Sequence, residues 1–346
     1  MSEFDLLLFD RITKIKSINE QYDLLNNGYI SFSGGKDSVI LSHLVDLALP
    51  NNKIPRLFLN TGIEYIDMVK FVKEIAEQDD RFVIYNNTTD IRKMLKEVGY
   101  PFKSKQHSRN MQVYQNNKEE CRKYIDMCEK DPKLLENFDF IHNLPKGVKT
   151  VVKYYFGVRE REKESCISLK VCPSKLKYQF REDMTFCMSD LCCYKLKKEN
   201  AHKWQEESGK TITMTGIRAE EGGMRTQGGC TVFDDDKLIK FHPLKVVDEE
   251  WENEFIKRYN VKLCKLYSPP YNFKRTGCRG CPFALDLQQQ LDIMKRLLPN
   301  EEKACEMLWQ PVYEEYRRIG YRLRKKSNQI SLFDFIEQAK ESINEK

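Results

Sequence analysis

The residues with the clearest chemistry form a glycine-rich loop, Ser33-Gly34-Gly35-Lys36-Asp37-Ser38. An apolar run at 28–32 precedes the loop and apolar residues at helical spacing follow it, which predicts a strand, a turn and a helix. Phosphate groups bind where backbone N–H groups converge at a helix N-terminus, and glycines permit a close approach. Lys36 adds a cation, and Ser33 and Ser38 add hydroxyl donors. We therefore predict that this loop binds the phosphates of a nucleotide.

A second group of polar and small residues follows the next predicted strand, at 56–59. This group consists of Asn60, Thr61 and Gly62. Ligands of open α/β sheets bind outside the carboxyl ends of the strands, so we expect these residues to meet the nucleoside. The alternative is a simple strand-to-helix turn in which Thr61 lies near a helix N-cap.

Four cysteines stand in pairs: Cys192 is adjacent to Cys193, and Cys278 and Cys281 form a C-x-x-C pair. Twelve cysteines are many for a reducing compartment, where paired thiols are first tested as metal ligands. Four thiolates bind either zinc or an iron–sulfur cluster. Adjacent cysteines fit the wide spacing of irons in a cubane better than a single tetrahedral zinc. We favour a [4Fe-4S] cluster, with zinc as the alternative and unligated thiols as the simplest interpretation.

The elements that must position these residues alternate between strand and helix. Strands are predicted at 28–32, 56–59, 82–85 and 211–214, a hairpin at 231–241, and a helix beginning after Asp248. This order predicts an α/β fold with a doubly wound, mostly parallel sheet. The polar segment at about 103–150 reads as a helical insertion that covers the carboxyl edge of the sheet. We divide the chain into a nucleotide-binding domain, 1–285, which includes the insertion and the cysteines, and a helical C-terminal region, 286–346.

The composition is that of an ordinary soluble globular protein, with 40% hydrophobic and 32% charged residues. No apolar run reaches the length of a membrane span, and the N-terminus does not resemble a secretory signal. These features predict a cytoplasmic protein without a membrane partner. The net charge of +6 permits a phosphate-rich partner without requiring one.

The glycine loop resembles the PP-loop of ATP pyrophosphatases, which split ATP between the α and β phosphates. Five further segments match in order: LNTGIEY, the Cys192-Cys193 pair, TGIRAEEGGMR at 215–225, HPLKVVDEEW at 242–251 and YNFKRTGCRGCPF at 271–283. Together they resemble the phosphoadenosine phosphosulfate (PAPS) reductase family of the PP-loop superfamily, over about 28–283. The resemblance implies a fold of the adenine nucleotide alpha-hydrolase type.

The resemblance also implies roles for individual residues. In adenylyl-sulfate reductases a tandem cysteine pair and a distant C-x-x-C bind a [4Fe-4S] cluster, which implies that role for Cys192, Cys193, Cys278 and Cys281. The segment TGIRAEE…R corresponds to an arginine-bearing loop of the family. Gly216 is thereby expected beside the nucleotide, and Arg218 and Arg225 are expected to contact phosphate or sulfate, an anion geometry that guanidinium suits.

ATP is the expected nucleotide, together with Mg²⁺. In such a site Lys36 and the loop amides would stabilise the charge on the leaving pyrophosphate, and a divalent metal would share it. Asp37 is expected either to contact that metal or to cap the following helix.

One departure from the family shifts the expected reaction. Reductases of the family attack the sulfonucleotide with a cysteine in a C-terminal Glu-Cys-Gly-Leu-His motif, whereas the last cysteine of this sequence, Cys305, lies within an apparent helix. The chain therefore resembles more closely the sulfur-transfer members, such as the ATP pyrophosphatase component that helps to place sulfur in the DNA backbone. We predict an enzyme that adenylates DNA or tRNA and lets a sulfur donor protein displace AMP. The alternatives are a sulfonucleotide reductase with another thiol, and a nucleotide-sensing or DNA-associated regulator.

Two further segments carry weaker signals. Ser104–Arg109 could contact an acidic substrate or could simply begin a helix. Gln329–Phe333, with the sequence QISLF, resembles the peptide by which bacterial proteins dock on the replication sliding clamp. An amphipathic terminal helix is the alternative interpretation of this segment.

Overall fold

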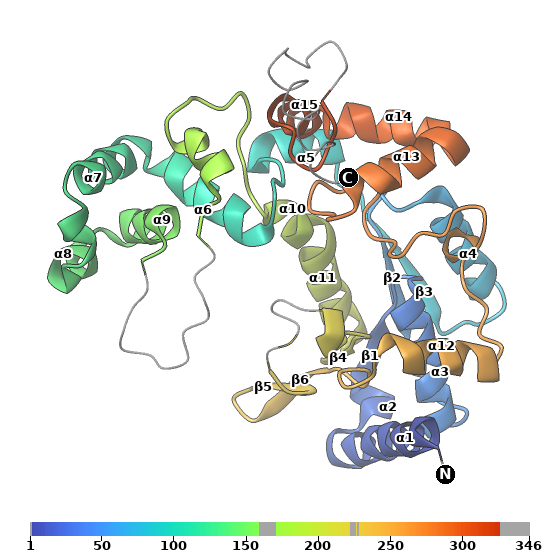
Figure 1. Ribbon diagram of the computed structural model, residues 1–346. Helices are drawn as coiled ribbons and strands as arrows, with labels where there is room; N and C mark the ends of the chain where they lie inside the picture. The colour runs from blue at the N-terminus through green and yellow to red at the C-terminus, as the bar shows by residue number, and fades with distance from the viewer. Residues whose placement is uncertain (1, 159–170, 222–225, 227, 326–346) are drawn as a thin grey trace. The chain divides into compact units, whose positions relative to one another are not determined.

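The computed structural model describes residues 2–158, 171–221, 226 and 228–325 (Figure 1). These residues form two compact units, each built from two segments of the chain. We call 1–89 with 195–279 the sheet unit, and 90–194 with 280–346 the helical unit. Among the residues described, no helix is both long enough and apolar enough to cross a membrane.

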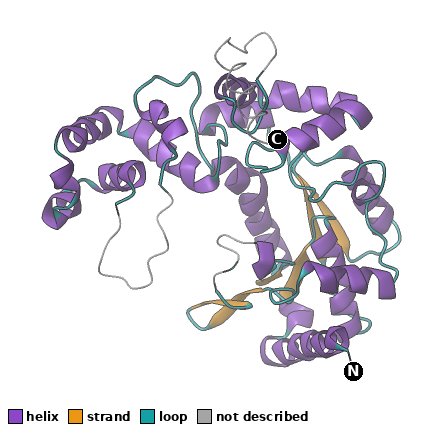
Figure 2. Cartoon of the chain, in the orientation of Figure 1, coloured by secondary structure: helices purple, strands orange, loops and turns teal. Residues whose placement is uncertain are grey.

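The sheet unit is organised around six strands (Figure 2). In spatial order these are β3 (Phe82–Asn86), β2 (Arg56–Asn60), β1 (Gly28–Ser31), β4 (Ile212–Met214), β6 (Lys237–Phe241) and β5 (Thr231–Asp234). All neighbours pair in parallel except the β5–β6 hairpin, which is antiparallel. The strand order reverses between β1 and β4, so the carboxyl end of β1 is the topological switch point where open α/β sheets bind ligands.

Helices cover both faces of this sheet. On one face Trp204 of α11 (Glu199–Ser208) packs against Tyr29 and Leu57. Successive residues of a strand point to opposite faces, so Ile30 and the following Phe32 face the other way. On that second face α3 (Lys36–Ala48) and α4 (Ile66–Ala76) share a cavity with Phe32. The predicted doubly wound, mostly parallel α/β fold is confirmed.

Further helices complete the sheet unit. The core helix α3 contacts α1 (Glu3–Tyr22) and α12 (Glu249–Arg258), while the short α2 (Leu24–Asn27) leads into β1. As predicted, α12 begins after Asp248, whose side chain accepts a hydrogen bond from the backbone N of Trp251 (2.8 Å). Trp251 in turn stacks on Phe4 of α1, with ring centroids 5.3 Å apart. These contacts fix the α12 face that is turned toward α3.

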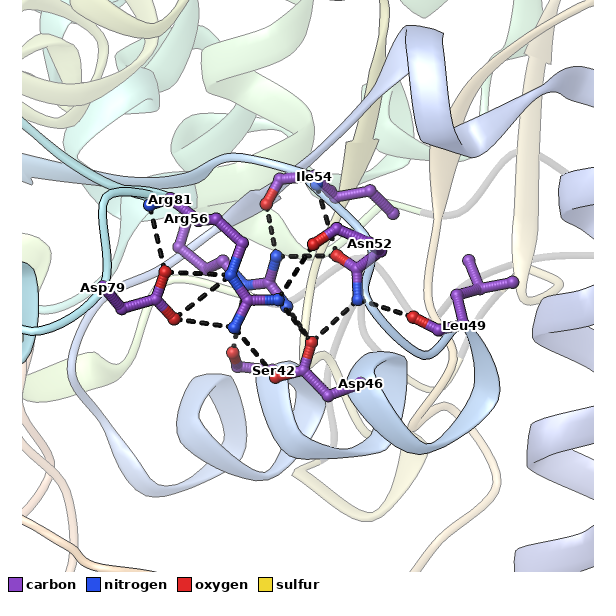
Figure 3. Close-up of polar contacts among 8 residues, drawn as sticks. All are labelled: Ser42, Asp46, Leu49, Asn52, Ile54, Arg56, Asp79 and Arg81. Carbon is purple, nitrogen blue, oxygen red and sulfur yellow. Dashed lines mark hydrogen bonds and ion pairs between the residues drawn. The ribbon is translucent and has the colours of Figure 1, made fainter.

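A buried ion-pair network ties the amino ends of β2 and β3 to the end of α3 (Figure 3). Arg56 is fully buried, and its guanidinium lies 2.6 Å from the carboxylate of Asp46 and donates to Ser42 (3.2 Å). Arg81 contacts the same Asp46 (2.7 Å) and also Asp79 (2.6 Å). Because a buried charge is costly unless it is paired, this network fixes how α3 lies on the two strands.

The helical unit consists of helices and connecting loops in its described part. Its α-helices are α5 (Ile91–Val98), α6 (Lys105–Asn116), α7 (Lys118–Lys130), α8 (Phe138–Asn143), α9 (Lys146–Phe156), α10 (Leu191–Cys193), α13 (Leu287–Leu297), α14 (Pro299–Leu308) and α15 (Gln310–Ile319). Helices therefore occupy the predicted insertion and the described part, 286–325, of the predicted C-terminal region. The position of the insertion over the sheet edge stays a prediction.

The segment Ser104–Arg109 is the beginning of α6. The side chain of Ser104 caps this helix by accepting from the backbone N of His107 (3.2 Å). The His107 ring is fully buried, with Nδ1 2.7 Å from the Tyr154 hydroxyl and Nε2 2.9 Å from Oε1 of Gln179. Burial lowers the pKa of His107 to about 3, so this ring is a neutral part of the core.

Candidate nucleotide site

The glycine-rich loop lies at the switch point of the sheet, between the end of β1 at Ser31 and the start of α3 at Lys36. Its shape is held by the Ser38 hydroxyl, which donates to the Gly35 carbonyl (2.8 Å) and accepts from the backbone N of Ser33 (3.2 Å). Helix α3 has Gly35 as its N-cap and no side-chain capping bond. Of the first three amides of the helix, that of Lys36 donates to the Tyr267 hydroxyl (3.2 Å) and that of Ser38 donates to the Gly35 carbonyl (3.0 Å). The Asp37 amide and the positive end of the helix dipole are what this turn offers an anion.

Asp37 lies in the first turn of α3 but does not cap the helix, so the capping role that was one of its two predicted alternatives is not seen. Its carboxylate instead lies 3.6 Å from Nε of Arg218, in the loop after β4. Gly216, in the same loop after β4, approaches α3 closely: a Cβ at this position would stand 2.8 Å from the Asp37 carbonyl oxygen. A glycine is required here because any side chain would push the β4 loop away from α3.

Two cations of the site share one carboxylate. Nζ of Lys36 lies 3.1 Å from Oε2 of Glu252, and Nε of Arg218 lies 3.3 Å from Oε1. Lys36 also approaches Glu249 (3.7 Å), and Arg218 pairs with Glu220 (2.5 Å). Lys36 and Arg218, predicted from separate motifs, are thus brought to the same point beside the first turn of α3.

Glu252 was not predicted from the sequence, although it is the most buried charged group of the site. Its side chain is 0% exposed, and neither carboxylate oxygen has a hydrogen bond of good geometry within the described structure. Burial, with the neighbouring Asp37, raises its pKa to about 8, against the opposing effect of Lys36 and Arg218. The helical spacing could have indicated that Glu252 is buried, because it follows Trp251 directly and stands three positions before Phe255, on the buried face of α12.

Tyr267 was also missed by the sequence reasoning. Its hydroxyl accepts a hydrogen bond from the backbone N of Lys36 (3.2 Å) and contacts the Thr276 hydroxyl. It therefore steadies the start of α3 from a position 231 residues further along the chain. No local pattern could have indicated this contact, because the fold alone brings the two segments together.

The residues after β2 form a compact turn. The backbone N of Thr61 donates to Oε2 of Glu64 (2.9 Å), and its hydroxyl donates to Oε1 (2.7 Å). Gly62 is exposed with φ +85°, and Asn60 bonds to Asn86 at the end of the neighbouring strand (2.9 Å). Thr61 is not the N-cap of α4, since that position is Tyr65. Asn60 and Gly62 keep their predicted place at the carboxyl edge of the sheet, while the Thr61 side chain is occupied by Glu64.

The four predicted cluster ligands are divided between the two units. Cys278 belongs to the sheet unit, while Cys281 and the α10 residues Cys192 and Cys193 belong to the helical unit. Over the described ranges, no group of three or more histidine, cysteine, aspartate or glutamate residues is arranged as a metal site. The ligand set therefore stays a prediction.

Two other predicted elements, Arg225 and the segment Gln329–Phe333, lie outside the described residues.

Comparison with known families identifies one domain over most of the chain. The model of the phosphoadenosine phosphosulfate reductase domain matches residues 27–133 and 133–284. The uncharacterized protein MJ0973 of Methanocaldococcus jannaschii is 28% identical over 124 residues, which are 33% of this chain and 30% of that protein. The match thus spans less than a third of the length of this relative.

Two solved structures are similar at low sequence identity. Phosphoadenylyl-sulfate (PAPS) reductase from Candida auris, in a phosphate complex, is 13% identical with a TM-score of 0.39, covering 80% of this chain and 96% of that one. The U34-tRNA thiolase NcsA from Methanococcus maripaludis, with its [4Fe-4S] cluster, is 12% identical with a TM-score of 0.36, covering 89% of this chain and 80% of that one.

Proposed function

The chain belongs to the phosphoadenosine phosphosulfate reductase family, and on this basis we propose that it is an ATP pyrophosphatase-like enzyme that adenylates an acceptor for sulfur transfer. The observation that carries the proposal is the meeting of Lys36 and Arg218 at the N-terminus of α3. Two cations beside converging amides suit a polyphosphate, whose charge increases on the bridging oxygen as pyrophosphate leaves.

In the proposed reaction an oxygen of the acceptor attacks the α-phosphorus of ATP. The bond from that phosphorus to the bridging oxygen breaks, and pyrophosphate leaves with the electron pair. Lys36 and the amides of the loop would stabilise the leaving group, and Mg²⁺ bound with the nucleotide would share its charge. Sulfide delivered by a donor protein would then attack the adenylated atom, and AMP would leave with the former acceptor oxygen.

A reductase-type reaction that uses Cys305 is less well supported. Cys305, the last cysteine of this sequence, is 1% exposed within α14. A nucleophilic thiol must ionise and reach its substrate, and burial opposes both. An oxygen acceptor on DNA or tRNA needs no such thiol, and the net charge of +6 is compatible with a polyanion. The segment Gln329–Phe333 would further link the protein to DNA through a sliding clamp.

A [4Fe-4S] cluster is the proposed resident cofactor, with zinc as the alternative. The chemistry of the predicted ligands fits such a cluster, because four thiolates hold it and four thiols are available. These are Cys192, Cys193, Cys278 and Cys281. The C-x-x-C turn depends on Gly280, where φ is +59° and a Cβ would stand 2.5 Å from the Tyr313 hydroxyl. The cluster would supply electrons or electrostatic stabilisation, while the binding of ATP rests on the sheet unit.

The proposal is tested by incubating anaerobically purified protein with ATP, Mg²⁺ and either duplex DNA or tRNA. We expect release of pyrophosphate that depends on one of these acceptors. Sulfite released from PAPS in the presence of thioredoxin, without pyrophosphate from ATP, would contradict the proposal and indicate a reductase. Tight ATP binding without any product would indicate a nucleotide-sensing regulator instead.

A further inference from the structure

We propose that Glu252 is a positioning residue of the phosphate site: it holds Lys36 and Arg218 while the site is empty and gives them up to the nucleotide by taking up a proton. This inference rests on the proposed nucleotide site and adds a mode of regulation to it. The residue touches both cations directly, at 3.1 Å and 3.3 Å, from a position that solvent does not reach.

Glu252 is surrounded by charged groups from three parts of the sheet unit. Lys36 and Asp37 of α3 lie on one side of it. Arg218, in the loop after β4, lies close to both Glu252 and Asp37 and also pairs with Glu220. On α12 itself, Glu249 approaches the same lysine. With every group ionised, these two cations stand among four carboxylates. The cluster then carries two excess negative charges and would repel the phosphates that it is expected to bind.

The contacts of α12 with α1 do not alter this balance. Asp5 of α1 pairs with Arg258 of α12 at 2.7 Å, so these two charges offset one another. Phe4 of α1 also stacks on Trp251, accepts a hydrogen bond from Nε1 of Trp251 at its backbone oxygen (3.4 Å), and its ring centroid lies 4.2 Å from the Arg258 guanidinium. None of these contacts brings a further charged group to the cluster.

Burial distinguishes Glu252 from the other three carboxylates of the cluster. Glu252 is the carboxylate of the group with no exposed side-chain surface, whereas the other three side chains are between 33% and 68% exposed. Desolvation penalises the charged form most where solvent is excluded, in agreement with a pKa raised to about 8. Protonation of Glu252 reduces the excess to one negative charge and weakens the hold of Glu252 on both cations. The remaining charge is carried by the three partly exposed carboxylates, which solvent and salt screen.

The protonation of Glu252 makes the affinity for a polyphosphate depend on pH. A bound polyphosphate adds negative charge and draws the cations away, and both effects raise the pKa of Glu252 further. Binding of the polyphosphate therefore takes up protons. Its affinity is highest at pH values below the pKa of Glu252 in the ligand-free protein, and it falls as the pH rises through about 8. If only the protonated form binds, affinity is about tenfold weaker at pH 9 than at pH 7.

The experiment measures ATP binding by calorimetry at pH 7 and pH 9, with EDTA present so that no metal ion contributes. The proteins are the wild type, Glu252→Gln and the matched control Glu250→Gln, which alters an exposed residue of the same helix. We expect the wild type and the control to lose about tenfold in affinity between the two pH values, and Glu252→Gln to change less than about twofold. At pH 9 the Gln variant should bind about tenfold more tightly than the wild type.

A purely structural role for Glu252 would give a different result. It would lower the melting temperature of Glu252→Gln and weaken binding equally at both pH values, which would overturn the proposal. If the Gln variant does not fold, Glu252→Asp retains the titrating group and must retain the pH dependence. Failure of the wild type to bind ATP at either pH, with or without Mg²⁺, would contradict the proposed function itself. Normal binding with an unchanged pH profile in Glu252→Gln would overturn this inference alone.

Discussion

At the scale of single residues, the site combines side chains that the sequence identifies with others that only the fold brings in. Lys36 and Arg218 stand in recognisable motifs, so their participation could be predicted from residue type and spacing. Glu252 and Tyr267 could not be predicted in the same way, because each reaches the loop from more than 200 residues away. Their roles depend on burial and distance, which are properties of the folded chain.

The cysteine prediction also belongs to the residue scale. If Cys281 is a cluster ligand, Cys281→Ser should lose most of the iron, since a hydroxyl is a poor substitute for a thiolate at iron. Anaerobically purified wild-type protein should contain about four irons per chain. Iron and sulfide analysis makes the measurement, with Cys230→Ser, a half-buried cysteine outside the predicted set, as the control. Zinc without iron in the wild type would contradict the [4Fe-4S] assignment.

At the scale of elements, local patterns were sufficient for most of the sheet unit. The strands β1 to β4 and the hairpin were predictable because their apolar runs are short and are bounded by turns. The start of α12 was predictable because Asp248 is a typical N-cap residue. The way in which α12 turns Glu252 toward α3 was not, because it depends on stacking between Trp251 and Phe4 from opposite ends of the sheet unit's sequence.

The network at the amino ends of β2 and β3 makes a prediction about stability. Arg56→Met should lower the free energy of unfolding by about 3 kcal/mol, because it leaves the buried Ile54 carbonyl without its guanidinium donor and leaves Asn52 Oδ1 with only the backbone N of Ile54. Asp46 keeps Arg81 as a partner, so the loss should stay at the lower end of the range for broken buried pairs. Chemical denaturation measures the difference, with the exposed Arg92→Met as control. An unchanged unfolding midpoint would show that the network does not stabilise the fold.

At the scale of the whole molecule, the chain forms two units from four alternating segments. Sequence patterns indicate where elements begin and end, but they carry little information on which distant segments share a core. The pairing of 90–194 with 280–346 is an example, since both segments are helical and neither contains a motif that refers to the other. The described residues that are predicted to bind ATP all lie in the sheet unit, and Arg225 is outside the described residues.

We propose that this unit binds ATP through the loop at Lys36. Equilibrium binding of ATP with Mg²⁺ to the wild type, to Lys36→Ala and to Lys70→Ala, which alters an exposed lysine of α4, tests it most directly. We predict that Lys36→Ala weakens binding by about tenfold or more, as expected for a lost charge-assisted contact, and that Lys70→Ala stays within about twofold of the wild type. Wild-type affinity in a correctly folded Lys36→Ala protein would contradict the account.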